Sequence, residues 1–187
     1  MFKRTRDYAK DYTHDGKSVC YTGKHYRLAM PRPELNRRKA AYLLLLICSA
    51  GLYLSVGLSG AASLGGAGEP AAFYVVLPYV VLLLPLGLAF VRALLLTVKN
   101  KPLEYAEYDK YLVRQKGALI AALILCGCLI LGNAAFLFFA AARGRGEAAA
   151  LAESFLCGLC IFGALSQFHT LFACVAIDEN GGVRYDI

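Results

Sequence analysis

Residues 40–60, AAYLLLLICSAGLYLSVGLSG, contain no charged side chain and decide the fold of this chain. A helix rises about 1.5 Å per residue, so a stretch of this length crosses the roughly 30 Å hydrocarbon core of a bilayer. Residues 71–91, AAFYVVLPYVVLLLPLGLAFV, have the same length and are also uncharged. Two more apolar stretches follow at 117–142 and 150–177, and we expect all four to be transmembrane helices.

The composition excludes an ordinary soluble domain. Hydrophobic residues make up 58% of the 187 residues and charged residues only 18%, whereas a globular domain carries about 25% charged residues. Four helices of this kind would expose a large apolar surface in water, which a chain of this length cannot bury in a soluble core. The sequence therefore predicts an all-α membrane protein, an antiparallel bundle of four transmembrane helices.

The four spans divide the basic residues unevenly. Residues 1–39 carry 11 Lys and Arg, residues 92–116 carry six, and Arg184 in the C-terminal tail makes 18 on one side. Only Arg143 and Arg145 lie on the other side. Because cytoplasmic loops accumulate basic residues, we expect both termini in the cytoplasm. Orientation and attraction to anionic lipid then explain the net charge of +7, and nucleic acid is not an expected partner.

The N-terminal segment, residues 1–39, has the pattern of β-structure. Asp15-Gly16 is a strong tight-turn dipeptide, and Thr22-Gly23 is a second candidate. Short runs rich in Tyr, Val and Thr lie between and around these turns, at 11–14, 17–21 and 24–28. This spacing predicts a three-stranded β-meander on the cytoplasmic side. The segment lacks an early apolar core, so we expect no cleavable signal peptide.

The C-terminal tail, residues 178–187, is predicted to form a hairpin. Its turn would be the Glu-Asn-Gly-Gly sequence at 179–182, between strands at 174–178 and 183–187. An isolated two-stranded hairpin is marginal in water. We therefore expect the two cytoplasmic tails to pair into one small sheet against the membrane. Two unstructured tails are the alternative.

Residues 100–116, between the second and third spans, are predicted to form an interfacial helix. Asn100 is a good helix cap. Tyr105, Tyr108 and Tyr111 recur every three residues, and tyrosine is enriched at the level of the lipid headgroups. We expect this helix to run directly into the third span.

Polar side chains inside the spans are few. Asn133 lies in the third span, and Cys160, Gln167 and Thr170 lie along one stripe of the fourth, which begins at Glu153 and repeats every seven residues. In a membrane such a stripe marks a contact between helices, because small residues allow close approach and amides bond across the contact. The alternative is that Asn133 and Gln167 line a substrate path.

The first two spans carry different packing features. Gly51, Ser55 and Ser59 recur every four residues, which predicts a face for close packing against another helix. Pro78 and Pro85 in the second span remove backbone donors and kink the helix, so they form a candidate hinge.

Seven cysteines raise the question of redox chemistry. Cys157 and Cys160 have the two-residue spacing of thiol–disulfide motifs and fall near the outer face. In this respect the chain is similar to the quinone-linked disulfide-forming membrane oxidoreductases, which are also four-helix proteins. Those enzymes need a second cysteine pair in their outer loops, which this chain lacks. Cys126 and Cys128 are expected to lie too deep to replace it.

No catalytic residue, cofactor or metal site is predicted. His14, Cys20 and His25 share the N-terminal segment but match no zinc spacing. No carboxylate lies in the middle of a span, where an ion-coupled pump would need one.

The leading hypothesis is a non-enzymatic accessory, assembly or scaffold component that acts through helix packing and its cytoplasmic face. Its partners would be the lipid bilayer and either another protein or a second copy. One alternative is a small transporter or channel subunit that works as an oligomer. Another is a membrane thiol–disulfide oxidoreductase that uses Cys157 and Cys160. The Ala- and Leu-rich helices and short loops favour a bacterial plasma membrane as the location.

Overall fold

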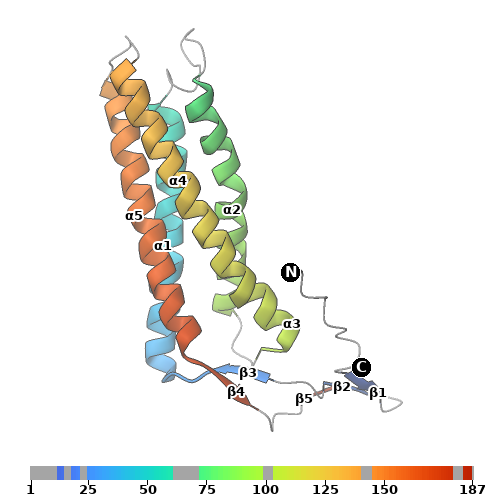
Figure 1. Ribbon diagram of the computed structural model, residues 1–187. Coiled ribbons are helices and arrows are strands. Elements are labelled where there is room, and N and C mark those ends of the chain that lie inside the picture. The colour runs from blue at the N-terminus through green and yellow to red at the C-terminus, as the bar shows by residue number, and fades with distance from the viewer. Residues whose placement is uncertain are drawn as a thin grey trace.

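Four long helices dominate the computed structural model, which describes residues 12–14, 18–21, 25–60, 72–98, 103–139, 145–178 and 183–186. They are α1 (Arg32–Ser59), α2 (Phe73–Val98), α4 (Arg114–Phe139) and α5 (Arg145–Ala173). A short helix α3 (Tyr105–Tyr108) and a π-helical turn η2 (Asp109–Val113) lead directly into α4. The strands are β1 (Tyr12–His14), β2 (Ser18–Tyr21), β3 (His25–Leu28), β4 (Val175–Asp178) and β5 (Val183–Asp186). Figure 1 shows the long helices side by side and the strands at one end, which we call the sheet end.

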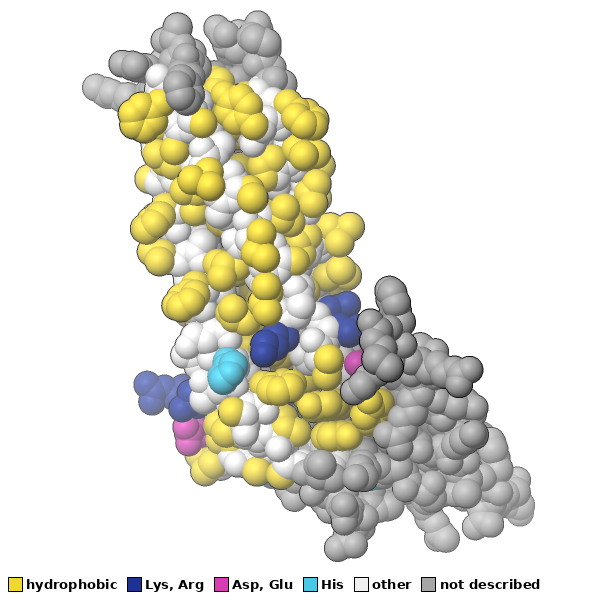
Figure 2. Space-filling model, viewed as in Figure 1, with side chains coloured by type: hydrophobic (Ala, Val, Ile, Leu, Met, Phe, Trp, Pro, Cys, Tyr) yellow, Lys and Arg dark blue, Asp and Glu magenta, His cyan; other side chains and the backbone are white. Residues whose placement is uncertain are grey.

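The helices have the length and the surface of membrane spans. α1, α2, the continuous segment Tyr105–Phe138 and Glu147–Ala173 are each long and apolar enough to cross a membrane. On the face shown in Figure 2, apolar side chains cover the described part of the helices. Leu58 is 83% exposed and Phe138 is 77% exposed, which is costly in water and favourable against lipid. The chain therefore has the character of a small membrane protein.

α1 begins at Arg32, eight residues before the predicted first span at 40–60. Pro33 lies in the first turn, where backbone N–H groups have no acceptor within the helix, so the absence of its N–H breaks no hydrogen bond. Glu34 lies in the same turn, near the positive end of the helix dipole, and its carboxylate pairs with Arg38 one turn later at 2.9 Å. These local contacts extend the helix beyond the apolar stretch.

The predicted interfacial helix at 100–116 is described from Leu103 onward, and from Tyr105 it is continuous with α4. The junction is the π-helical turn η2, in which the backbone N–H of Arg114 donates to the carbonyl of Asp109. The same two residues form a side-chain ion pair at 2.9 Å. The wider turn therefore places their side chains within bonding distance at an offset of five residues.

Buried residues in the four long helices follow one pattern. They are separated alternately by three and four residues, with one step in α2 that departs from the alternation, and this is the spacing of coiled-coil core positions. The series are Lys39, Tyr42, Leu46, Ser49, Tyr53 and Val56 in α1; Val75, Pro78, Leu82, Pro85, Ala89, Ala93 and Leu96 in α2; Leu112 of η2 followed by Gln115, Leu119, Ala122, Cys126, Leu129, Asn133 and Phe136 in α4; and Glu147, Ala150, Ser154, Cys157, Ile161, Ala164, Phe168 and Leu171 in α5. Leu86 and Gly132 are also buried, each next to a member of its series. α1 packs against α5 and α2, and α4 packs against the same two helices, so the four series meet in a common core.

The prediction of a packing face at Gly51 is wrong. Gly51 is exposed, and nothing lies within 4 Å of the position where a Cβ would be. The buried series of α1 passes through Ser49 and Tyr53 instead, so Gly51 falls on the opposite side of the helix.

Pro78 and Pro85 are both buried, and α2 continues through them. Pro78 has no N–H, so the carbonyl of Tyr74, one turn earlier, loses its usual helical donor. α4 approaches this carbonyl so closely at Gly132 that a Cβ added there would lie 2.7 Å from the oxygen. A glycine Cα–H can act as a weak donor to such an oxygen. The carbonyl that Pro78 leaves without a helical donor is therefore in contact with Gly132 of α4, and the hinge stays a prediction.

Strands from the two chain ends pair at the sheet end. β3 pairs antiparallel with β4, with His25 opposite Asp178 and Leu28 opposite Val175. β2 lies between β1 and β5 and is antiparallel to both. The pairing of β3 with β4 starts where the helices stop, because the N–H of Ala29 donates to the carbonyl of Cys174 at 2.8 Å.

The two tails pair with each other, as expected, but they form two sheets instead of one, and the partners predicted within each tail are wrong. A C-terminal hairpin at 178–187 would pair β4 with β5, and an N-terminal meander would pair β2 with β3. In the structure β4 pairs with β3, and β2 pairs with β1 and β5. The reason is that α1 and α5 are neighbours, so β3, which precedes α1, and β4, which follows α5, start side by side. β4 also ends the fourth helix at Ala173, before the predicted end at 177.

Several predicted features lie outside the described residues. They are the turns at Asp15-Gly16, Thr22-Gly23 and 179–182, the cap at Asn100 and the loop between the first two spans.

Replacing Gly132 by alanine is expected to lower the free energy of unfolding in detergent micelles by about 1–3 kcal/mol. The added methyl group would meet the backbone oxygen of Tyr74, which cannot rotate away as a side chain can. The matched control is Gly127→Ala in the same helix, where nothing lies within 4 Å of the new Cβ and alanine has the better helix propensity. Equal stability of the two variants would contradict the contact.

Candidate functional site

Asn133, the predicted polar residue of the third span, lies in the interior between α4 and α5. It is buried, and its Nδ2 donates to Ser154 Oγ at 3.0 Å. Ser154 Oγ donates in turn to the carbonyl of Ala150 at 2.7 Å, and the Ser154 carbonyl accepts from the thiol of Cys126 at 3.4 Å. These bonds tie α4 to α5. Asn133 Oδ1 has no hydrogen-bond partner among the described residues.

The predicted stripe on α5 lies beside the buried series. Cys160, Gln167 and Thr170 are half-buried, and each comes one residue before a core position of the helix. One residue is a rotation of about 100° on a helix, so the stripe lies along one edge of the interior face.

This edge of α5 faces α1. A Cβ added to Gly163 would lie 3.3 Å from the side chain of Leu45. Nearer the opposite end, Ser55 Oγ donates to Glu153 Oε1 at 2.8 Å. The stripe therefore lies along the contact between the first and last helices.

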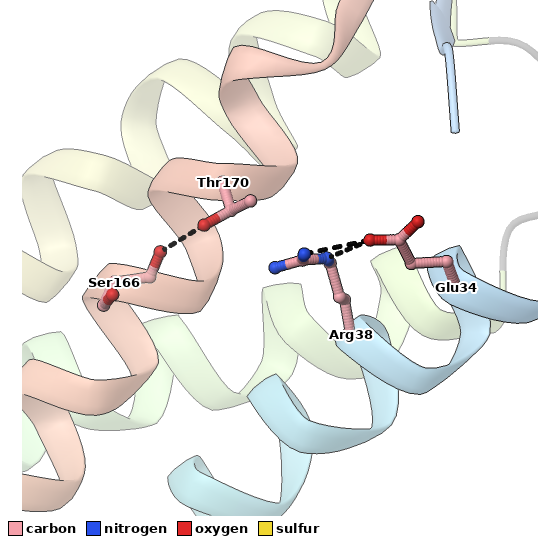
Figure 3. Close-up of polar contacts among 4 residues, drawn as sticks. All are labelled: Glu34, Arg38, Ser166 and Thr170. Atoms are coloured by element: carbon pink, nitrogen blue, oxygen red, sulfur yellow. Dashed lines mark hydrogen bonds and ion pairs between the residues drawn. The ribbon is translucent and has the colours of Figure 1, made fainter. Parts of the chain in front are cut away.

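Thr170 lies at the sheet end of this contact. Its hydroxyl donates to the carbonyl of Ser166 at 3.1 Å, and Figure 3 shows the pair opposite Arg38, whose guanidinium is held by Glu34. The structure places Gln167 in this region, whereas Asn133 bonds to Ser154, 13 residues away along α5, which corresponds to about 20 Å. The predicted residues therefore belong to two separate places.

The thiols of Cys126 and Cys157 lie against one another between α4 and α5. Both are buried, and Cys157 donates to the carbonyl of Ser49 on α1 at 3.4 Å. Both residues occupy core positions on neighbouring helices, so Cys126 lies at the depth of Cys157, inside the bundle and not in an outer loop. Cys160 instead lies near Cys48 of α1. The cysteines of the helices and the residue that follows α5 are free thiols: Cys48, Cys126, Cys128, Cys157, Cys160 and Cys174.

A polar contact that the sequence did not indicate joins three helices nearer the sheet end. Gln115 of α4 is buried, and its Nε2 donates to the hydroxyl of Tyr42 on α1 and to the carbonyl of Ala89 on α2, the latter at 2.9 Å. Its Oε1 has no hydrogen-bond partner among the described residues. The sequence signal that could have indicated burial of Gln115 is its spacing, three residues after Leu112 and four before Leu119, which matches the core positions of the helix.

Aromatic rings connect the β3–β4 sheet to the helices. Tyr26 of β3 stacks on Tyr108 of α3, with ring centroids 4.1 Å apart and planes at 14°. Tyr108 lies 6.2 Å from Phe172, Phe172 lies 6.3 Å from Phe168, and Phe168 lies 5.8 Å from Tyr42 in the core. Aromatic contacts of this kind each add about 0.5–1.5 kcal/mol beyond area burial.

β3 is held on its second edge by the segment that leads into α3. Tyr26 donates to the carbonyl of Leu103 at 2.8 Å and accepts from its N–H at 2.9 Å. One strand therefore joins β4, which follows α5, to the start of the third membrane helix.

Basic side chains gather at the sheet end. Figure 2 shows Lys and Arg where the apolar surface of the helices gives way to the region of the strands. The exposed or half-buried basic residues of the described helices there are Arg32, Arg37, Arg38, Arg92, Lys110, Arg114 and Lys116. Glu147 and Glu153 lie toward the opposite end of α5.

The chain matches no protein-family model, no curated protein and no solved structure. Within the described ranges, no group of three or more His, Cys, Asp or Glu is placed to hold a metal ion.

Oxidation distinguishes the two cysteine pairs. In a background without other cysteines, a chain that keeps Cys126 and Cys157 is expected to lose the mass of two hydrogen atoms when treated with iodine. The two thiols already lie in contact, so a disulfide forms while iodine is reduced to iodide. The matched chain that keeps Cys157 and Cys160 is expected to retain both thiols, as intact mass would show. A disulfide in the second chain and none in the first contradicts this placement.

Proposed function

We propose that this protein is a non-enzymatic accessory, assembly or scaffold component of the plasma membrane. It forms an antiparallel four-helix bundle, with both termini and their strands in the cytoplasm. The observation that carries this proposal is the joining of the two chain ends. Strands that precede α1 and follow α5 pair with each other, and Tyr26 fixes them to the helices through Tyr108. A surface fixed in this way suits the binding of a partner protein.

The distribution of basic residues supports the cytoplasmic placement of the sheet end. The four-span arrangement puts 18 of the 20 Lys and Arg on that side. Among the described residues, arginines from α1, α2 and α4 lie at that end, as is usual for the cytoplasmic ends of membrane helices.

The polar groups of the helices support a packing role. Ser55 bonds to Glu153 across α1 and α5, Asn133 bonds to Ser154 across α4 and α5, and Gln115 bonds to two further helices. Contacts of this kind hold membrane helices in one arrangement, because hydrophobic burial alone does not favour helix association in lipid.

Two buried amide oxygens favour transport as the second candidate. Asn133 Oδ1 and Gln115 Oε1 have no hydrogen-bond partner among the described residues, and a polar solute would supply donors to them. Apart from Ser49, whose hydroxyl donates to the carbonyl of Leu46 on its own helix, the buried side chains between these two amides are apolar, however. Its fully buried side chains include Leu46, Leu82, Leu119 and Ile161. A path along the core would have to open this packing, so the scaffold role is the better supported.

Purification from native membranes in mild detergent is expected to yield the chain in a stoichiometric complex, with another protein or a second copy. A sample that contains the chain alone, as a monomer, would rule out the accessory role.

The sheet can be tested directly by Val19→Pro. Val19 lies in the central strand β2, opposite His14 on one side and Tyr185 on the other. Proline removes a ladder donor there, and sheets of such short strands are marginal. We expect recovery of the partner to fall by about tenfold, the effect of roughly 1.4 kcal/mol.

The matched control is Val19→Thr, which keeps a β-branched side chain and a backbone donor, and it should retain the partner. Thermal unfolding of both variants in detergent should match that of the parent, because the substitution lies outside the helices. Retention of the partner by the proline variant would place the binding surface elsewhere and contradict the proposal.

A further inference from the structure

Arg92 lies within the apolar surface of α2. The neighbouring side chains of Val91, Leu94 and Leu95 are exposed. The helix continues to Val98, six residues beyond Arg92, which adds about 9 Å. A guanidinium group among lipid-facing side chains is costly unless it reaches water, headgroups or an anion.

A contact with α4 brings a second arginine to the same place. Arg92 Nη1 donates to the backbone carbonyl of Arg114 at 3.1 Å. The guanidinium of Arg114 pairs through Nε with Asp109 Oδ2 at 2.9 Å, and its side chain remains 62% exposed. Arg92 of α2 is therefore bonded to the backbone of a residue that carries a second guanidinium, and the ion pair with Asp109 compensates the charge of Arg114 but not that of Arg92.

Lys110 adds to the excess of positive charge. It is exposed, and its Nζ lies 5.5 Å from the ring centroid of Tyr111. It is placed one turn before Arg114, on the segment that enters α4. Like charges near an apolar surface repel one another more strongly than in bulk water, because the local dielectric constant is lower. An anion at this place relieves the repulsion.

We propose that Arg92 and Arg114 bind the phosphate group of an anionic phospholipid at the contact between α2 and α4. The hydrogen bonds described above use Nη1 of Arg92 and Nε of Arg114, so other N–H groups of each guanidinium are available to phosphate oxygens. The planar guanidinium matches two such oxygens at once.

The surroundings identify the anion as a lipid rather than free phosphate. Val91 and Leu95 on α2 and Val113 at the start of the third span are exposed beside the two arginines, and they offer an apolar surface to acyl chains. The level is also that of headgroups, because the basic side chains lie where the apolar surface of the helices ends (Figure 2).

The test is a thermal-unfolding titration of the full chain in a neutral detergent. Phosphatidylglycerol is added in one series, phosphatidylcholine in a second and inorganic phosphate in a third. Phosphatidylglycerol is expected to raise the melting temperature in a saturable way, because a ligand that binds only the folded state stabilises it. The other two additions are expected to leave the melting temperature unchanged.

Arg92→Gln and Arg114→Gln are expected to weaken the phosphatidylglycerol titration by about tenfold or more each, as for the loss of a hydrogen bond to a charged group. The matched control is Arg37→Gln, which removes one exposed arginine of α1 at the same end and should leave the titration unchanged. The melting temperature of each variant without lipid shows that it is folded.

Three results would overturn the proposal. An equal effect of phosphatidylcholine would mean that the headgroup charge is not recognised. An equal effect of inorganic phosphate would identify a site for the free anion. Equal weakening by Arg37→Gln would mean that the lipid responds to the total charge of this end and not to Arg92 and Arg114.

Discussion

The contact between α1 and α5 determines much of the remaining structure. Because the first and last long helices are neighbours, the strand that precedes one and the strand that follows the other begin side by side, and the bond from Ala29 to Cys174 is the first of their pairing. Buried side chains at alternating steps of three and four residues hold this contact and those with α2 and α4. The polar bond between Ser55 and Glu153 and the close approach at Gly163 fix the two helices along their length.

Hydropathy was sufficient to predict the four long helices, because an uncharged stretch of this length has few other stable structures in lipid. The ends of the helices were harder to predict. Arg32 begins α1 in a polar segment, stabilised by Pro33 and the pair of Glu34 with Arg38. The positions of the tail strands were also close to those expected, since β-forming residues and turn dipeptides act locally. Pairing between the two tails was also expected, but the partner of each strand was not, because strand pairing depends on which helices are neighbours.

The candidate site was less predictable for a physical reason. Residues that repeat every seven positions define a stripe, but the stripe through Gln167 and the one through Phe168 have the same period. Periodicity alone does not tell which faces the interior, and the structure places Phe168 there and Gln167 at the edge. Gln115 was assigned to an interfacial segment because charged residues flank it, although it bonds three helices together. The contact of Cys126 with Cys157 likewise depends on the depth at which two helices are aligned.

The central claim is that the joined chain ends lie on the cytoplasmic side of a protein that crosses the membrane four times. Single cysteines at Ala29→Cys and Ala148→Cys, in a background without other cysteines, test it most directly, because both positions are exposed and lie at opposite ends of the helices. With a membrane-impermeant thiol reagent, the cysteine at position 29 is expected to react only in inverted vesicles and that at position 148 only in intact cells. Reaction of both from the same side, or the reverse pattern, would contradict the account.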